Sequence, residues 1–565
     1  MSNQNGNEYD VIVIGSGIGG LACASFLSVF GGKKVLVLEQ NETPGGCMQT
    51  VTDPVTGDAD GETGTEDLGW TWNYGIQYLA FLSTWLGPLR VRETDFINKL
   101  TDNKVELVDL DLEFLRLKLP DFEDREYSLL SDLDEFREYL HRKFPNDKCD
   151  IDEYWSHLEL VDNNLFWVIL PKVLPHPLGR ILFPVLMQKL EPLMNRTFQD
   201  AISEIQNPEI RLILSSYWNF MGMGLDTNLL FWSISQNQQM HGIQVPKGGA
   251  KALVDGLIGA IQKRGGDIRT GVYGTVSEII LEGLLCKKAT GVKLVDGTEI
   301  KARTVVSAAG LPQTIGKLVP AKAFPSRVSR SIDPDRHVSL PSNLILRVGF
   351  DKEVDYKFMS KLIDKAVYRK IHNKSWEMDD DPTALDWKPL DVMFFFPKYY
   401  FSDKKSKMPQ TVEIASITDF RRYFSKYKSY DDPEYQKMEK RVSEKLLDEL
   451  GEWFPELRAH VAHHWLSSPL TIYERIRHQG AAIYGMDSYK ILDTDIQSRS
   501  GIKNLYLTGE DTFAQGVTTC CGLTTAMVIL VDELLSLKTL GKLPGMIRTL
   551  FTPWNKLWNL PERYR

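Results

Sequence analysis

The chain has 565 residues, with 66 Lys and Arg against 75 Asp and Glu, for a formal net charge of −9. This length provides for two or three domains with substantial cores, and the acidic balance argues against a nucleic-acid partner. The six cysteines lack the spacing of a metal site, and the adjacent Cys520 and Cys521 have poor geometry for a disulfide. We therefore expect a protein of a reducing compartment, with no metal site.

The first strong motif, near the N-terminus, is "YDVIVIGSGIGGLACASFL". Its β-branched run, Val11–Ile14, is typical of a strand buried on both faces, and the small apolar residues after the glycines indicate a helix. Between them, Gly15, Gly17 and Gly20 have the G-x-G-x-x-G spacing. In a dinucleotide-binding turn the first glycine permits the sharp turn, the second lets the backbone approach the phosphates, and the third lets the helix pack on the strand. The helix N-terminus, where Ile18 stands, offers unpaired N–H groups and a positive dipole end to the pyrophosphate.

A second strand is expected at Lys33–Gln40 and ends in Glu39, 24 residues after the first glycine of the motif. A carboxylate at this strand tip accepts hydrogen bonds from ribose hydroxyls, and the neighbouring Gln40 is included in the predicted site. Gly45 and Gly46 follow, where flavoproteins commonly have a second glycine pair that lets the chain pass close under the pyrophosphate and ribityl chain. A purely structural glycine turn is the alternative, and the agreement of strand, glycines and acid favours dinucleotide binding.

The middle of the chain, residues 81–240, is expected to be helical. One amphipathic helix is expected in "YSLLSDLDEFREYLHRKFP", with apolar residues at Leu129, Leu130, Leu133, Phe136 and Leu140. The apolar stretch Leu165–Leu190 contains four prolines and four basic residues, whereas a spanning helix needs about twenty mostly uncharged residues. We therefore expect broken amphipathic helices at a membrane interface, and a buried pair of proline-kinked helices is the alternative. The tail, residues 541–565, mixes Trp and Phe with basic residues, which also suits a water–lipid boundary.

From Gln244 the chain is expected to return to the nucleotide-binding domain. A helix that ends at Gly265–Gly266 precedes a hairpin whose turn is Asp296–Gly297. The β-branched strand Thr304–Val306 then ends in three small residues that suit packing beside the adenosine part of a cofactor. Further on, the expected strands of a substrate sheet are "DVMFFFPKYYF" and "QTVEIASIT", and an expected helix is "EYQKMEKRVSEKLLDELGEWF".

The C-terminal region supplies the second half of the expected site. A strand at Leu505–Leu507 leads to Gly509, Glu510 and Asp511, and a glycine-marked helix follows. This order suggests that Asp511 holds a ribityl hydroxyl, while the helix N-terminus, with Val517 before it, faces the second phosphate. Asp511 as a helix N-cap is the alternative, and the two roles can coexist.

With both ends in view, the chain resembles the FAD-dependent phytoene desaturase, carotenoid isomerase and retinol saturase group, on the flavin amine oxidase-type scaffold, over nearly its full length. The motifs that carry the resemblance are the N-terminal glycine motif, "GIQYL" at 75–79, "QVPKGGAKALVDGLIGAIQKRGGDI" at 244–268, "TVVSAAG" at 304–310, "SPLTIYERIRHQGAAIYGMD" at 468–487 and the turn at 509–511. They are most similar to those of the retinol-saturase-like branch, which usually has His where this chain has Gln77 and Asp where it has Asn73. The resemblance implies FAD as the cofactor and places Gln77, Tyr78 and Glu510 near the isoalloxazine as candidate catalytic residues, where they would deliver a proton or stabilise a charge. A structural role is the alternative for each.

The predicted function is that of an FAD-dependent oxidoreductase that acts on the carbon–carbon double bonds of a long apolar polyene, by saturation, desaturation or cis–trans isomerisation. Candidate substrates are retinoids, carotenoids and polyunsaturated acyl chains, and an external electron carrier is expected because the sequence has a single G-x-G-x-x-G unit. A flavin amine oxidase and a non-catalytic prenyl- or lipid-binding protein of the GDP-dissociation-inhibitor type are the alternatives. The short polar leader before the first strand predicts a cytoplasmic protein. Peripheral contact of this protein with membranes is also expected.

We expect an α/β fold with a Rossmann-type FAD-binding domain, an α+β substrate domain and a helical, membrane-facing segment. The FAD-binding domain is expected to comprise residues 1–80, 241–312 and 476–540. The helical region is expected at 81–240, the substrate domain at 313–475 and an amphipathic tail at 541–565.

Overall fold

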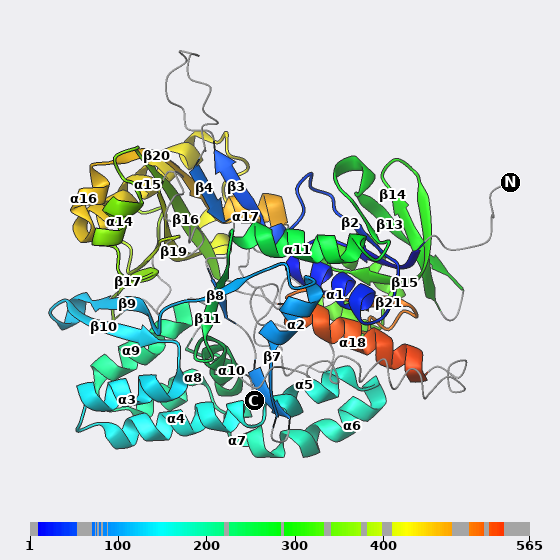
Figure 1. The fold of residues 1–565 in the computed structure, drawn as a ribbon, viewed down its shortest axis with the longest axis horizontal. Coiled ribbons are helices and arrows are strands. Elements are labelled where there is room, and N and C mark those ends of the chain that lie inside the picture. Colours follow the sequence, from blue (N-terminus) through cyan, green and yellow to red (C-terminus); the bar gives the residue numbers. More distant parts are fainter. Residues whose placement is uncertain are drawn as a thin grey trace, which may run out of the picture.

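The structure, a computed structural model, describes most of the chain. The described residues are 9–53, 70–73, 75, 78–80, 83–86, 89–219, 225–283, 287–332, 341–373, 381–397, 410–476, 497–512 and 519–535. Gln77 and Val517, both in the predicted site, and the tail 541–565 lie outside these ranges. Figure 1 shows one sheet with its helices on the right, a second sheet at the upper left and a layer of helices below.

The first sheet contains the predicted strand–turn–helix unit. Its strand order is β12 (Asp267–Arg269), β2 (Val35–Leu38), β1 (Tyr9–Ile14), β15 (Glu299–Ser307), β14 (Lys288–Leu294) and β13 (Val276–Glu282), with β21 (Leu505–Leu507) also paired to β15. The strand β1 runs parallel to β2 and β15, and β15 runs parallel to β21. Strands from the N-terminal, middle and C-terminal parts of the chain therefore lie side by side.

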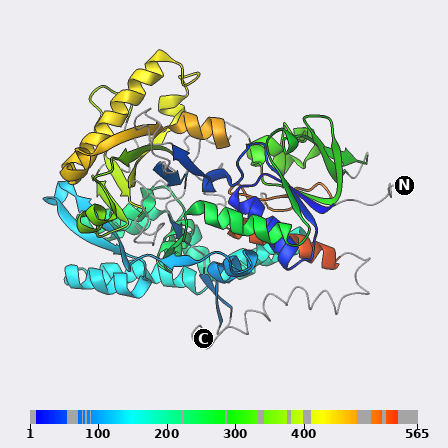
Figure 2. The same ribbon diagram turned by 45° about the horizontal axis from the view of Figure 1, so that its top comes forward.

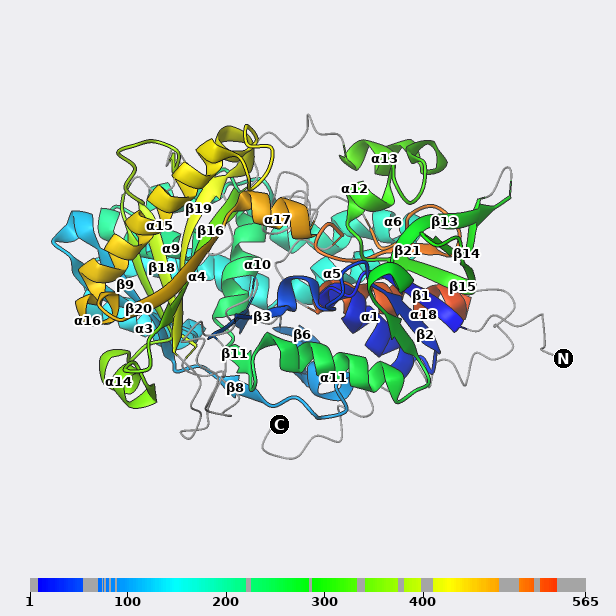
Figure 3. The same cartoon turned by 90° about the horizontal axis from the view of Figure 1, so that it is seen from above.

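The strand β1 is buried on both faces, which explains its continuous β-branched run. Val11 and Val13 pack with the helices α1 (Ile18–Val29), α11 (Ala250–Gln262) and α18 (Cys520–Leu535). Ile12 and Ile14 pack in a second cluster with residues of β13, β14 and the segment that follows β15. Figure 3 shows α1 beside α11 in this part of the molecule.

The second sheet has its own core. Its strand order is β10 (Arg125–Leu130), β9 (Glu113–Leu119), β17 (Val367–Ile371), β18 (Asp391–Phe395), β19 (Thr411–Asp419), β16 (Pro341–Phe350) and β20 (Val461–Ser467). The long helix α15 (Pro433–Trp453) covers one face, where Val442 and Leu446 belong to the same buried cluster as Leu346 and Val412. Figure 2 shows α15 lying along this sheet. The two strands predicted in this region are confirmed as β18 and β19, and the predicted helix is confirmed as α15.

One predicted helix is wrong in its first part. Leu129 and Leu130 lie in β10, and α3 (Leu133–Lys143) begins after Asp132, whose carboxylate accepts two backbone N–H groups of the first helical turn. Leu129 pairs with Leu115 of β9, so that the edge of the second sheet comes from the region that was expected to be helical. Pairing with a distant strand outweighs the local helical pattern here.

The remaining helices form a layer that lies below both sheets in Figure 1, together with shorter elements. The layer contains α4 (Lys148–Asp162), α5 (Leu165–Val173), α6 (His176–Met187), α7 (Glu191–Met194), α8 (Phe198–Glu204), α9 (Pro208–Asn219) and α10 (Leu229–Gln239). Short helices elsewhere are α2 (Glu93–Leu100), α12 (Leu311–Thr314), α13 (Ser326–Ser329), α14 (Tyr356–Leu362), α16 (Pro455–Arg458) and α17 (Pro469–Ile476). Small sheets are formed by β5 (Leu79–Ala80), β11 (Ile243–Pro246) and β8 (Leu107–Asp109), by β3 (Thr50–Asp53) and β4 (Trp70–Asn73), and by β6 (Ser83–Leu86) and β7 (Leu89–Arg92). Within the described ranges, every helix is too short or too polar to cross a membrane.

A buried ion pair joins the second sheet to the helical layer. Arg369 of β17 donates from Nε and Nη2 to the carboxylate of Asp391 on β18, at 2.9 and 2.6 Å. Its Nη1 donates to the carbonyl oxygen of Ser216 on α9. Both charged side chains are buried, so loss of either one leaves an uncompensated charge in the interior.

We expect Arg369→Met to destabilise the protein by about 3–5 kcal/mol, because the Asp391 carboxylate loses its partner. The double variant Arg369→Met with Asp391→Leu should recover part of this loss, since both charges are then gone. The midpoint of thermal unfolding measures the difference. As a control, Lys437→Met breaks an exposed pair with Glu434 and should move the midpoint little. A double variant as unstable as the single one would contradict this account.

Candidate functional site

The three glycines of the first turn have different neighbours. Gly15 has a φ of 97°, and a Cβ there would lie 2.8 Å from the carbonyl oxygen of Ala308. A Cβ on Gly20 would lie 2.2 Å from the carbonyl oxygen of Gly15. A Cβ on Gly17 would meet nothing within 4 Å among the described residues. Packing of the chain therefore requires glycine at the first and third positions, whereas the second position borders open space.

The helix α1 begins beside this open space. Its N-cap is Gly17, no side chain of the described residues caps its first turn, and no acidic residue occurs in that turn. The first N–H groups and the positive end of the helix dipole are therefore available to an anion. These features fit a cofactor diphosphate that passes over Gly17.

A cleft of about 580 Å³ follows the carboxyl ends of the parallel strands, where open α/β sheets bind ligands. The predicted cofactor-binding residues that line it are Gly15, Gly17, Ile18, Gly20, Glu39, Gln40, Gly46, Gly509 and Asp511. Gly45 is next to Gly46, and its N–H donates to Ser16 Oγ at 3.1 Å. Val517 lies outside the described residues. The cleft therefore brings together glycines and acids from both ends of the chain.

Hydrogen bonds of Glu39 and Ser16 connect the two glycine turns. Its Oε2 accepts the backbone N–H of Ser16 at 2.9 Å and the Ser16 hydroxyl at 2.7 Å. Its Oε1 accepts the N–H of Asn41 at 2.9 Å. A carboxylate accepts about four hydrogen bonds, so Glu39 keeps capacity for a further donor such as a ribose hydroxyl.

Asp511 joins the C-terminal turn to the end of β15. Its Oδ2 accepts the backbone N–H of Leu311, the first residue of α12, at 2.7 Å. The carboxylate therefore satisfies the first N–H of a short helix that lies 200 residues earlier in the chain.

Two cysteines lie in the wall of the cleft together with Glu510. Cys47 and Cys521 both line it, as does Glu510, one of the three predicted catalytic residues. Burial, and then the negative charge of Glu510, raise the pKa of Cys521 to about 12 and also raise the pKa of Cys47. The raised pKa favours the neutral thiol over the thiolate at both positions. A Cβ on Gly19 would lie 2.7 Å from Cys521 Sγ, so this glycine makes room for the thiol.

Tyr78, another predicted catalytic residue, packs away from the cleft against the second sheet. Tyr78 is half-buried and is not one of the cleft residues. Its ring packs against Phe114 and Phe395 of the second sheet, with centroid distances of 5.9 and 6.5 Å. Gln77 lies outside the described residues. Tyr78 therefore faces the apolar interior beside the second sheet.

The cleft also includes residues for which we had no sequence prediction. They include Val276 and Ser277 at the start of β13, and Gln313, Lys317 and Leu318 in and after α12. The nearby Gly274 is the sequence feature that indicates Val276 and Ser277. A Cβ on Gly274 would lie 2.4 Å from the carbonyl oxygen of Glu39. Glycine is therefore required where the start of β13 approaches the tip of β2.

The chain matches the family of flavin containing amine oxidoreductases over residues 18–520. It is 27% identical over 538 residues to all-trans-retinol 13,14-reductase of Danio rerio, with 89% of this chain and 82% of that protein covered. It is 28% identical over 369 residues to the chloroplastic prolycopene isomerase of Arabidopsis thaliana, with 62% of this chain and 56% of that protein covered. The family match confirms the predicted flavin.

The fold is also found among solved structures. An oxidoreductase from Methanosarcina mazei has a TM-score of 0.56 and 16% identity, with 93% of this chain and 100% of that chain covered. At this identity the likeness concerns the fold alone, and it confirms the predicted α/β class.

We expect Gly17→Val to weaken FAD binding by about tenfold or more, because the added side chain fills the space over which the diphosphate passes. The cofactor-free protein should keep its thermal midpoint, since a Cβ at this position meets nothing within 4 Å among the described residues. Titration of the deflavinated protein with FAD, followed by flavin absorbance and calorimetry, measures the affinity.

The matched control is Gly15→Val, which collides with the Ala308 carbonyl and requires a positive φ. This control should lower the midpoint of the cofactor-free protein itself. An unchanged FAD affinity in Gly17→Val would show that the cofactor does not pass over this glycine.

Proposed function

The chain belongs to the family of flavin-containing amine oxidoreductases and uses FAD, and on this premise we propose that it acts on the double bonds of a long apolar polyene. The proposed reaction is saturation or cis–trans isomerisation of a carbon–carbon double bond. The observation that carries the proposal is the likeness along nearly the whole chain to a protein named all-trans-retinol 13,14-reductase. The likeness to a prolycopene isomerase supports the same class of substrate, because retinol and prolycopene are both conjugated polyenes.

In this proposal FAD lies in the described cleft. Gly17 and the first turn of α1 hold the diphosphate, Glu39 accepts a ribose hydroxyl and Asp511 accepts a ribityl hydroxyl. Bound FAD supplies a hydride to a carbon of the polyene or accepts one from it. We also propose an external electron carrier, because the sequence has a single G-x-G-x-x-G unit.

An apolar interior between the second sheet and the helical layer supports a polyene substrate. Tyr78 packs with Phe114 and Phe395, and the buried cluster around them extends to Cys521 in the wall of the cleft. Side chains of this kind exclude water and favour an apolar chain, whereas an amine needs polar partners. Tyr78, and Gln77 outside the described residues, are our proposed groups for holding a proton near the reacting carbons.

We expect the holoenzyme to convert all-trans-retinol or prolycopene, and to release no hydrogen peroxide with amines. Flavin-reduced and flavin-oxidised protein are each incubated with these polyenes, a polyunsaturated fatty acid and putrescine, and the products are separated by chromatography. Gly17→Val without FAD is the control and should convert nothing. Peroxide from the amine, with all polyenes unchanged, would contradict the proposal and favour the amine oxidase alternative.

We propose in addition that α5 and α6 form a membrane-contact face. Large apolar side chains on one face of α6 are exposed to solvent, namely Leu178, Ile181 and Val185. The segment 165–190 has no Asp or Glu in a chain with a net charge of −9, and its Arg180 and Lys189 are exposed. Apolar side chains with basic neighbours suit a surface of anionic lipids. The C-terminal tail, outside the described residues, is a proposed second contact.

This face is fixed to the cofactor-binding part of the molecule. Arg499 donates to the carbonyl oxygens of Val173 and Leu174, at the end of α5, at 3.0 and 2.7 Å. Arg499 also forms an ion pair with Asp532 of α18 at 2.7 Å. Because α18 begins at the cleft, lipid contact at α6 would set the orientation of the cofactor site relative to the membrane.

We expect the double variant Ile181→Asp with Val185→Asp to reduce binding to anionic vesicles by about tenfold or more, because two side chains that are 71% and 68% exposed become charged. Sedimentation with phosphatidylserine-containing vesicles measures binding, and added salt should weaken it. The control Leu385→Asp changes an apolar side chain that is 82% exposed elsewhere on the surface and should bind as the parent does. Equal binding by all three proteins would refute the contact face.

A further inference from the structure

The cleft that fits FAD is lined by more negative than positive charge. Among the described residues of its wall, the carboxylates are Glu39, Glu42, Glu510 and Asp511, and the basic side chain is Lys317. FAD brings further negative charge on its diphosphate. Because like charges disfavour one another, this wall opposes any additional negative charge on the bound cofactor. The size of that effect depends on where each charge lies along the cleft.

Lys317 and Glu42 lie at the adenosine end. Lys317 is exposed and directly precedes Leu318, whose carbonyl oxygen accepts the N–H of Ile279 on β13 at 3.0 Å. The carboxylate of Glu42 lies beside Gly271, where a Cβ would be 2.2 Å from its Oε1. Both side chains are therefore near the segment that enters β13, which approaches the tip of β2 where the adenosine ribose is proposed to bind.

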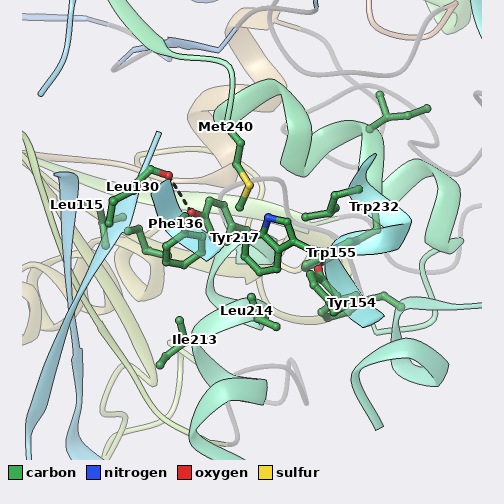
Figure 4. Close-up of a cluster of buried hydrophobic side chains, with 14 of the residues drawn as sticks. Leu115, Leu130, Phe136, Tyr154, Trp155, Ile213, Leu214, Tyr217, Trp232 and Met240 are labelled. Carbon is green, nitrogen blue, oxygen red and sulfur yellow. Dashed lines mark hydrogen bonds between the residues drawn. The ribbon is translucent and has the colours of Figure 1, made fainter. Parts of the chain in front are cut away.

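Glu510 lies at the other end of the cleft. Burial and then the negative charge of Glu510 raise the pKa of Cys47, which follows the second glycine pair, and of Cys521 in α18. Cys521 also belongs to the buried cluster against which Tyr78 packs, and Figure 4 shows the part of this cluster around Trp155. Glu510 is therefore located where the cleft meets the apolar interior, the side on which the isoalloxazine would face an apolar substrate.

A second carboxylate, that of Glu93, lies next to the start of α18 and is not part of the cleft wall. Glu93 is the first residue of α2 and is 5% exposed. It accepts the hydroxyl of Thr519, whose carbonyl oxygen in turn accepts the N–H of Leu523 at 3.0 Å and so begins α18. Burial raises the pKa of Cys520, and the charge of Glu93 raises it further. The Glu93 carboxylate thus stands at the N-terminus of α18.

The two carboxylates outweigh the dipole of α18. The positive end of a helix amounts to roughly half an elementary charge, and at this place it would favour an anion in the cleft. Glu93 and Glu510 each bring a full negative charge to the same end of the helix. Because Glu93 is buried, its charge is screened little by salt. The part of the cleft next to α18 is therefore electronegative.

We propose that Glu510 and Glu93 keep the reduced isoalloxazine in its neutral form, an inference that rests on the FAD site of the proposed function. Reduction of FAD takes up two electrons, here from the external carrier, together with one proton to give an anion or two protons to give a neutral ring. Two nearby carboxylates disfavour the anion, so the second proton is retained. Saturation of a carbon–carbon double bond consumes one hydride and one proton, and the neutral form supplies both. In this role the carboxylates act through their charge and donate no proton.

The test is a potentiometric titration of the FAD-loaded protein at pH values from neutral to alkaline. The midpoint potential of the parent should fall twice as steeply with pH as that of a couple that takes up one proton with two electrons. In Glu510→Gln and in Glu93→Gln, the pH at which this slope halves should be about one unit or more lower, because one negative charge is gone. The absorption spectrum of the reduced protein reports the same change from neutral to anionic flavin.

The matched control is Glu42→Gln, which removes the same charge at the adenosine end and should keep the slope of the parent. A parent that takes up one proton with two electrons at neutral pH would overturn the inference, whatever the variants do. Slopes of both glutamine variants that follow the parent at every pH would overturn it as well. The titration needs no polyene, so a failure of polyene conversion beside the expected slopes would refute the proposed substrate and not the effect of the carboxylates.

Discussion

The carboxylate of Glu39 holds two glycine turns at the tips of two neighbouring strands. One oxygen binds Ser16 in the first turn, and Ser16 in turn accepts the N–H of Gly45 in the second. The N-terminus of α1, the open space over Gly17 and the second glycine pair therefore keep one geometry. The proposed reaction requires this geometry, because a flavin cofactor must be held before a substrate carbon can be placed beside it.

Local sequence signals predicted this part well. A strand buried on both faces, a glycine that must adopt a positive φ and a carboxylate at a strand tip each leave a mark within a few residues, as at Gly15 and Glu39. Contacts between distant segments leave no such mark. The hydrogen bond between the carboxylate of Asp511 and the N–H of Leu311 joins residues that are 200 apart in the chain. Pairing with Leu115 places Leu129 in a strand, although the sequence around Leu129 has a helical pattern. The placement of Tyr78, one of the three predicted catalytic residues, also depends on distant packing, which sets its ring against Phe395.

Gln236 of the buried helix α10 illustrates the same limit. Its amide oxygen accepts the hydroxyl of Tyr154, which lies 82 residues earlier in the chain, and no local sequence pattern indicates this bond. The exposed apolar face of α6 was easier to predict, since prolines and basic residues interrupt its apolar run in the sequence itself.

The central claim is that both ends of the chain close around one FAD in the cleft between Gly17 and Asp511. A crystal structure of the purified yellow protein tests it most directly. We predict electron density for one FAD per chain, with its diphosphate over Gly17, its adenosine ribose on Glu39 and its ribityl chain beside Asp511. A cleft filled by protein side chains, or a flavin bound elsewhere, would contradict the account.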